Sequence, residues 1–218
     1  MKKLLVIAFF LAGSIIYAQK ASQSGPSVRL NGYATYAFAD NHVDSYYSDT
    51  QYFEGSIEDG FEYGGGLEVL PAPYMGVEFS YLRLDTKAPL EYYDNTVKFT
   101  SFNLASNYLF LGFNKYVNVN PKVEPYAGLM LGMAIYNVEN PENSNTGSST
   151  KFAWGLKAGS NIWLSEKIGL KLQAQLLSAV QAIGGSVYFG TGGAGAGVSG
   201  FSTYYQFNLG GGLVFKLK

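Results

Sequence analysis

The chain of 218 residues has no cysteine, a single histidine, His42, and few charged residues, 14% of the total. Without cysteine it has no disulfide framework, no thiolate metal site and no cysteine nucleophile. The formal net charge of −1 provides no basic field to attract nucleic acid. We therefore expect no metal, no cofactor and no nucleic-acid partner.

Long apolar runs are also scarce. Lys2 and Lys3 precede an apolar stretch over residues 4–16, and Ala18 precedes the polar Gln19. This order is typical of a secretory signal peptide at 1–18, cleaved after Ala18, with 19–26 as a short N-terminal segment. No later stretch reaches the length of about 18 apolar residues that a membrane helix needs. The exported chain is predicted to be either soluble outside the inner membrane or a membrane β-barrel.

Glycine and aromatic residues, by contrast, are abundant, with 27 Gly, 18 Tyr and 15 Phe. Apolar and polar residues alternate with a period of two through much of 27–218, which predicts strands with one apolar and one polar face. The strands are expected near 28–38, 60–70, 76–84, 97–112, 123–137, 151–164, 168–176 and 205–217. The fourth is irregular, because Leu109, Phe110 and Leu111 cannot share a face.

The predicted connections differ at the two ends. Longer loops are expected at about 40–58, 85–96, 138–150 and 179–201, and short turns at 71–75, 113–122 and 164–167. This asymmetry predicts an all-β, eight-stranded antiparallel up-and-down transmembrane β-barrel. A soluble barrel is the alternative. The polar face is rich in Gly, Asn and Gln rather than Lys and Glu, and the apolar face is rich in aromatic residues, which favours the membrane barrel.

Short motifs in the second half of the chain support the same fold. They are Val123-Glu124-Pro125-Tyr126-Ala127-Gly128, Leu131-Gly132, Phe152-Ala153-Trp154-Gly155, Leu164-Ser165-Glu166-Lys167-Ile168 and Gly211-Gly212-Leu213-Val214-Phe215. Over 27–218 the chain resembles the outer-membrane β-barrel domain family, which includes small barrels similar to that of outer-membrane protein A. The resemblance implies a monomer in the outer membrane of a Gram-negative bacterium. Its partners would be outer-membrane lipids, lipopolysaccharide and the barrel assembly machinery.

Two details qualify the resemblance. The predicted cleavage point lies between Ala18 and Gln19, and an Ala-Gln pair at this point resembles the signal peptides of Bacteroidota. Barrels of this family usually end on an aromatic residue, whereas here Phe215 is followed by Lys216-Leu217-Lys218. The resemblance therefore implies that the assembly machinery reads a shifted signal.

Charged residues recur in the polar rows that are predicted to face the lumen. They are Arg29, Glu62, Glu68, Glu78, Lys98, Glu124, Lys157 and Lys171. Opposite charges inside a narrow barrel should pair, because an unpaired buried charge is unfavourable. One interpretation is a static network that fills the lumen, since eight strands leave room for little more than side chains. The other, which the resemblance allows, is a gate in which Glu68 or Glu124 exchanges partners among Arg29, Lys157 and Lys171.

Tyrosines and acids recur together in the predicted outer loops. The set is Tyr46, Tyr47, Asp49, Tyr52, Phe53, Tyr92, Tyr93 and Asp94. Tyrosine offers a large contact area at low entropic cost, and acids can hold divalent cations against lipopolysaccharide phosphates. We hypothesise a binding surface for a host, phage or lipopolysaccharide partner. The alternative is an upper aromatic girdle with ordinary solvated loops.

No catalytic residue is predicted. His42, Asp44 and Ser45 lie close together in a loop, but a triad is defined by spatial roles that sequence proximity does not provide. Gly190 to Gly195 matches G-x-G-x-x-G, but no acid follows Glu166, so a nucleotide site is rejected in favour of an outer loop. We expect a structural or surface-interaction role without catalysis. The alternatives are a small gated pore for small or hydrophobic solutes, a lipid A-modifying enzyme and a component of a secretion machine.

Overall fold

A computed structural model describes the backbone of residues 26–48, 51–94, 96–142, 144–180, 186–190, 193–197 and 203–217. The predicted signal peptide lies outside these residues. Among the described residues, no helix is long and apolar enough to cross a membrane.

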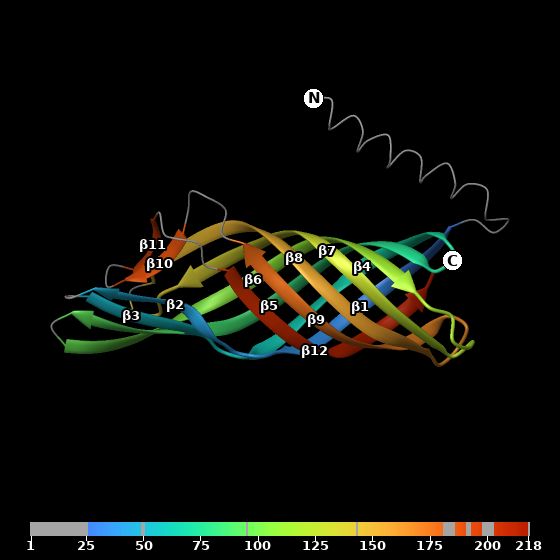
Figure 1. Cartoon of the computed structure of the whole chain (residues 1–218), viewed down its shortest axis with the longest axis horizontal. Coiled ribbons are helices and arrows are strands. Elements are labelled where there is room, and N and C mark those ends of the chain that lie inside the picture. Colours follow the sequence, from blue (N-terminus) through green and yellow to red (C-terminus); the bar gives the residue numbers. More distant parts are fainter. Residues whose placement is uncertain are drawn as a thin grey trace, which may run out of the picture.

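Eight strands close into a barrel (Figure 1). They are β1 (Ser27–Ala37), β4 (Gly60–Ala72), β5 (Met75–Asp94), β6 (Thr96–Tyr116), β7 (Val123–Glu139), β8 (Thr146–Trp163), β9 (Ile168–Val180) and β12 (Thr203–Lys216). Their order around the wall is β5-β4-β1-β12-β9-β8-β7-β6, and β6 pairs again with β5. Every neighbouring pair is antiparallel. The predicted eight-stranded antiparallel barrel is confirmed.

Both described ends of the chain and the short connections lie at one end of the barrel, called the inner end here (Figure 1). The connection between β4 and β5 contains Tyr74, which has a φ of 64°, in the left-handed region that a tight turn requires. The inner connections span 73–74, 117–122 and 164–167, at the positions predicted for short turns. The opposite, outer end carries the longer excursions.

The connections at the outer end contain more β-structure than predicted. The predicted loop at 40–58 is a hairpin of β2 (Asp40–Ser48) and β3 (Gln51–Ile57), and β3 also pairs with β5. Part of the predicted loop at 179–201 forms a second hairpin, of β10 (Ser186–Gly190) and β11 (Gly193–Gly197). The loop predictions for these segments were wrong, because strand pairing continues where the apolar-polar alternation has stopped.

The predicted loop at 85–96 was wrong for the same reason. β5 and β6 stay paired from Met75 opposite Lys115 to Asp94 opposite Thr96. The outward residues Asp85 and Lys87 are polar and exposed at this level, as expected above the apolar band of the membrane wall. The alternation that reveals a membrane strand therefore disappears although the hydrogen-bonded ladder continues.

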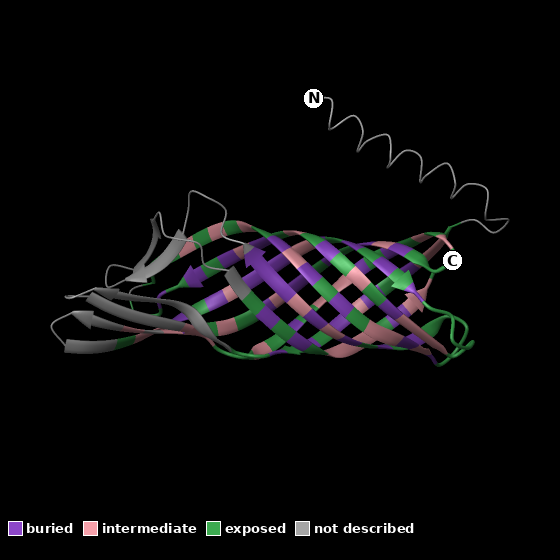
Figure 2. Cartoon of the chain, in the orientation of Figure 1, coloured by how far each residue is buried: buried purple, intermediate pink, exposed green. Residues whose placement is uncertain are grey.

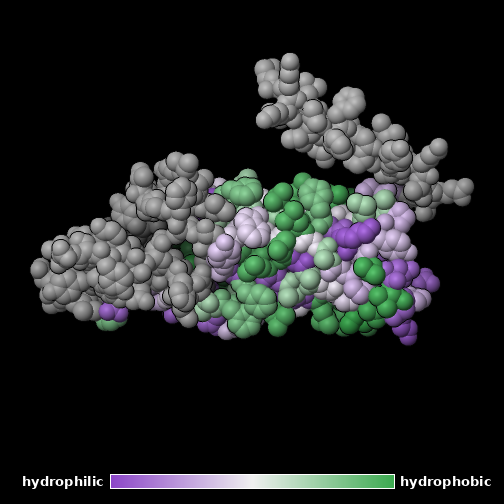
Figure 3. Space-filling view, in the orientation of Figure 1, coloured by the Kyte–Doolittle hydropathy of each residue, from purple (hydrophilic) through white to green (hydrophobic). Residues whose placement is uncertain are grey.

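Side chains alternate between an exposed outer face and a buried lumen along each membrane strand (Figure 2). The outer face carries many exposed hydrophobic residues. On the face shown in Figure 3 they form a band over the middle of the barrel, and hydrophilic residues gather toward the inner end. The irregular fourth strand follows the same rule, because Phe110 is buried in the lumen and Leu111 is exposed on the outside. Apolar residues occupy both faces there because the lumen itself is apolar at this level.

The apolar part of the lumen lies in its outer half. It contains Leu82, Ala88, Phe102, Leu104, Tyr108, Phe110, Met130, Ala134, Tyr136, Val138, Ala153, Leu177 and Ala179. The rings of Tyr108 and Phe110 are stacked, with centroids 5.7 Å apart. This half of the barrel is filled as a soluble protein core would be.

Candidate functional site

The lumen is the most elaborate polar site in the described structure. Nearest the inner end, Arg29 of β1 donates two hydrogen bonds to Glu124 of β7, at 2.8 and 3.0 Å. Its guanidinium also lies over the rings of Tyr116, 4.7 Å from the centroid, and Trp163, 5.3 Å away. Asn161 donates to the same carboxylate at 3.0 Å. The two-pronged pair fixes β1 against β7 across the barrel.

A second ion pair lies deeper. The ammonium of Lys157 is 2.5 Å from a carboxylate oxygen of Glu78, and both side chains are almost fully buried. Asn31 donates to Glu78 at 2.7 Å, and the hydroxyl of Tyr33 donates to the same oxygen. Asn31 and Tyr33 follow Arg29 in the inward row of β1, so one strand serves both ion pairs.

Two buried carboxylates face each other on neighbouring strands. Glu68 of β4 and Glu78 of β5 are direct register partners, an arrangement in which like charges repel. The amide of Asn114 bridges them by donating to Glu68 at 2.7 Å and to Glu78 at 3.3 Å. The hydroxyl of Tyr116 donates to both oxygens of Glu68, at 2.7 and 2.8 Å. Glu68 is therefore stabilised in the lumen by hydrogen bonds from uncharged donors.

Glycines make room for these two carboxylates. A Cβ at Gly66 would lie 2.3 Å from a carboxylate oxygen of Glu78, and one at Gly76 would lie 2.0 Å from an oxygen of Glu68. Each acid therefore leans over a glycine on the opposite strand, and the two lean in opposite directions along the barrel. A side chain at either glycine would have to displace the carboxylate that leans over it.

Lys171 of β9 is buried without a hydrogen bond. Its ammonium has no hydrogen-bond partner among the described residues, although the residue is only 1% exposed. It lies 4.4 Å from the ring centroid of Tyr126 and 5.8 Å from that of Tyr33. Cation–π contact is thus its main described interaction.

Glu62 of β4 lies further toward the outer end, where uncharged hydrogen-bond donors surround its carboxylate. It accepts hydrogen bonds from Thr35 at 3.1 Å, from Gln206 at 3.3 Å and from Gln175. Among the described residues no Lys or Arg forms an ion pair with it. Tyr108 donates to Gln206 at 3.0 Å, which connects this amide cluster to the apolar half of the lumen.

The structure thus places seven of the eight predicted lumen residues in one polar interior, with Glu124 at its inner edge. The eighth, Lys98, lies on β6, but its side chain is outside the described residues. Sequence reasoning missed the uncharged members of the network, which are Asn31, Tyr33, Asn114, Tyr116, Tyr126 and Asn161. Their inward position in the alternation was available as a signal. The described residues include no group of His, Asp and Glu that could hold a metal.

The predicted outer binding residues lie at the outer end, but their side chains are outside the described residues, as is that of His42. Tyr46 and Tyr47 belong to β2, Tyr52 and Phe53 to β3, and Tyr92, Tyr93 and Asp94 to β5, while Asp49 is wholly outside the described set. The backbone register places Tyr46 opposite Phe53, and Phe53 opposite Tyr92. Three aromatic positions therefore form one row across the outer sheet.

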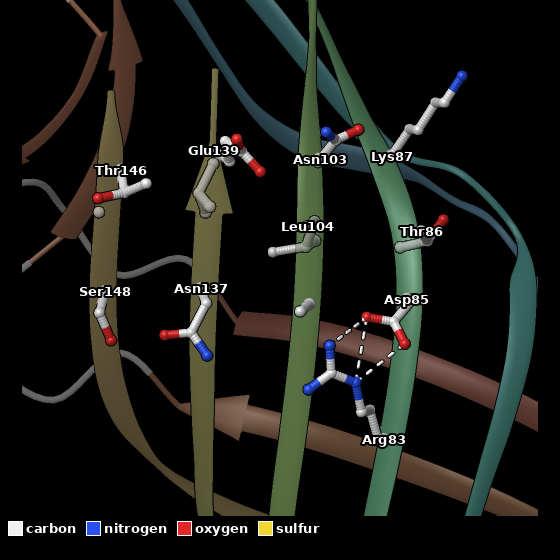
Figure 4. Close-up of a pocket in the computed structure, with 13 residues that line it drawn as sticks. Arg83, Asp85, Thr86, Lys87, Asn103, Leu104, Asn137, Glu139, Thr146 and Ser148 are labelled. Atoms are coloured by element: carbon white, nitrogen blue, oxygen red, sulfur yellow. Dashed lines mark hydrogen bonds and ion pairs between the residues drawn. The ribbon is translucent and has the colours of Figure 1, made fainter. Parts of the chain in front are cut away.

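An open groove of about 780 Å³ lies on the outward face of β5, β6, β7 and β8 near the outer end (Figure 4). Its lining residues are Arg83, Asp85, Thr86, Lys87, Asn103, Leu104, Ala105, Asn137, Val138, Glu139, Thr146, Gly147 and Ser148, of which Leu104 and Val138 also belong to the buried cluster of the lumen. The guanidinium of Arg83 donates to both oxygens of Asp85, at 2.7 to 3.1 Å. Sequence reasoning did not find this groove, because its residues come from four strands.

A family model for the outer membrane protein β-barrel domain matches residues 5–215. The chain belongs to this family. This outer-membrane β-barrel protein therefore resides in the outer membrane. In bacterial barrels of this kind the short turns face the periplasm and the longer loops face outward. Cleavage after Ala18 and an origin in Bacteroidota stay predictions.

Solved structures show the same fold at low sequence identity. The outer-membrane β-barrel protein is similar to Neisserial surface protein A, NspA, with 15% identity and a TM-score of 0.59, over 89% of this chain and 98% of that one. It is also similar to OprG from Pseudomonas aeruginosa, with 10% identity, a TM-score of 0.50 and coverage of 88% and 96%. The outer membrane protease OmpT from Escherichia coli has 9% identity, a TM-score of 0.51 and coverage of 88% and 96%. No curated protein sequence matches the chain.

Proposed function

We propose that this outer-membrane β-barrel protein is a closed membrane anchor that presents a binding sheet at the cell surface, without catalysis. The observation that carries the first half is the burial of side chains in both halves of the described lumen. Two ion pairs and their hydrogen-bond partners fill the inner half, and stacked aromatic and aliphatic side chains fill the outer half. Because the interior of an eight-stranded barrel is just wide enough for side chains to fill it, this packing supports a lumen that is closed to solutes within the described residues.

The outer sheet supports the second half of the proposal. β5 and β6 continue as a paired hairpin to Asp94 and Thr96, and β2 and β3 extend that sheet on the β5 side. The row of Tyr46, Phe53 and Tyr92 crosses it. A hydrogen-bonded sheet that carries aromatic positions loses less entropy on binding than an irregular loop would, which suits a surface that recognises a partner.

Single-channel recording of the refolded protein in planar bilayers tests the closed lumen. We expect no current steps above the baseline, with a large porin reconstituted in parallel as a positive control. Regular steps in the purified protein would contradict the closed anchor.

Surface binding is tested by adding bacterial cells that display the protein to a layer of epithelial cells and counting the bacteria that are retained after washing. We expect deletion of residues 45–53 to abolish retention, whereas deletion of 186–197, which removes the other outer hairpin, leaves it unchanged. Folding of each variant is checked by the shift between unboiled and boiled samples on a gel. Equal retention of both deletion variants would rule out the outer sheet as the binding surface.

A small gated pore is the second candidate, and one observation favours it. The Lys171 ammonium lacks a hydrogen-bond partner among the described residues, so it is free to exchange its ring contacts for a carboxylate. If the wild type conducts, Lys171→Met should change the fraction of time that the pore is open. An unchanged open fraction would exclude Lys171 as the moving charge.

A further inference from the structure

The groove at the outer end lies where the lipid-facing wall turns from apolar to polar. On β5 the outward residues Phe79 and Tyr81 are followed by Arg83, Asp85 and Lys87. The hydroxyl of Tyr81 donates to Asn107 at 2.7 Å, which ties the aromatic level of β5 to the adjacent strand. The groove is therefore continuous with the surface that contacts membrane lipid, at the level of lipid head groups.

The same change occurs on the other walls of the groove. On β7 the exposed Leu131 and Met133 precede Asn137 and Glu139, and on β8 the exposed Phe152 follows Ser148 along the chain. The groove crosses four neighbouring strands whose outward residues are polar at this level. It is therefore about 14 Å wide, since neighbouring strands are about 4.8 Å apart. This width suits a head group larger than that of an ordinary phospholipid.

The groove combines neutral hydrogen-bonding groups with one available cation. Asn103, Asn137, Thr146 and Ser148 contribute exposed amides and hydroxyls. Arg83 forms an ion pair with Asp85, whereas the exposed ammonium of Lys87 forms no ion pair or hydrogen bond with the side chains that the structure describes. Backbone register places Lys87 opposite Asn103, and Asn103 opposite Glu139.

We propose that this groove binds the head group of a phosphorylated glycolipid of the outer leaflet. The ammonium of Lys87 contacts a phosphate, and the amides, hydroxyls and Glu139 carboxylate contact sugar hydroxyls. The acyl chains run toward the inner end over the apolar wall that includes Met133 and Phe152. The lipid assignment rests on the continuity of the groove with that wall and not on the outer binding sheet.

Native mass spectrometry of the refolded protein in detergent tests the proposal with three lipids. These are bisphosphorylated lipid A, the same lipid without phosphate, and phosphatidylglycerol. We expect the protein to retain the bisphosphorylated lipid in clear preference to the other two. Lys87→Gln should reduce this retention by about fivefold or more, because it removes a charge-assisted contact.

Lys115→Gln is the matched control, because Lys115 is also exposed on the outward face of β6, but at the inner end. We expect it to retain lipid like the wild type, and an equal loss in both variants would overturn the site. Equal retention of phosphatidylglycerol or of dephosphorylated lipid A by the wild type would overturn the phosphate and sugar contacts. Glucosamine 1-phosphate is expected to leave the bound lipid in place. Complete displacement by it would make the occupant a soluble sugar phosphate and overturn the lipid assignment.

Discussion

The two halves of the lumen bury carboxylates in different ways. In the inner half Glu78 contacts the Lys157 ammonium and Glu124 contacts the Arg29 guanidinium. In the outer half Glu62 is surrounded by the hydroxyl of Thr35 and the amides of glutamines, beside an apolar cluster. The inner half thus depends on matched charges, because each charged group offsets the desolvation cost of burying its partner. The outer half tolerates one acid within a neutral environment.

The largest effect is expected when an ion pair of the inner half is broken from one side. Lys157→Met leaves Glu78 buried without its cation, which should lower the free energy of unfolding by about 3–5 kcal/mol. Urea titration of the protein in lipid vesicles measures this change. The double variant Lys157→Met with Glu78→Gln should recover most of the loss. A single variant as stable as the wild type would remove the basis of the comparison.

A smaller loss is expected when the charge is kept but its shape is changed. Arg29→Lys keeps a cation beside Glu124 but loses the two-pronged contact and the stacking over Tyr116 and Trp163. The expected loss is about 1–3 kcal/mol in the same titration. An unchanged midpoint would mean that a point charge suffices at the inner end.

Removal of a hydrogen bond between uncharged groups in the outer half should lower the unfolding free energy by less than either change to an ion pair. Tyr108→Phe removes the hydroxyl that donates to Gln206 and keeps the ring that stacks on Phe110. We expect a loss of about 1 kcal/mol in unfolding free energy. A loss as large as that of Lys157→Met would show that the outer half depends on its polar network as strongly as the inner half.

The smallest effect is expected at the lone acid. Glu62→Gln removes the desolvation penalty of a buried charge, which offsets the weaker hydrogen bonds from Thr35 and Gln206. The unfolding free energy should stay within about 1 kcal/mol of the wild type in vesicles. Destabilisation by several kcal/mol would indicate that Glu62 has a cationic partner beyond the described residues.

The sequence predicted the faces of the membrane strands because lipid and lumen select different side chains. Val69 and Glu68, for example, fall on opposite faces as the alternation requires. The rule weakened at Phe110, where the lumen is as apolar as the lipid. It also failed beyond Arg83, where the strand leaves the apolar band and the outward residues become polar. The alternation of apolar and polar residues therefore indicates the environment on each side of a strand, and a strand whose two faces lie in similar environments does not show it.

The charged residues of the lumen were predictable, but their pairing was not. Arg29 and Glu124 are far apart in the sequence, and which acid meets which base depends on the relative stagger of β1, β4, β5, β7, β8 and β9 around the barrel. Tyr33 and Tyr116 were missed because inward tyrosines look the same in a sequence as those of an aromatic girdle. The outer groove was missed since four strands contribute to it.

Gly66 and Gly76 also constrain which substitutions the protein can accept during evolution. A side chain at either glycine would occupy the space of a carboxylate and push Glu68 and Glu78 toward each other. Replacement of a glycine should therefore be accepted only after one of the two acids has been lost. Among homologous sequences, positions 66, 68, 76 and 78 are expected to change as a group, with the loss of an acid at 68 or 78 before the replacement of a glycine at 66 or 76.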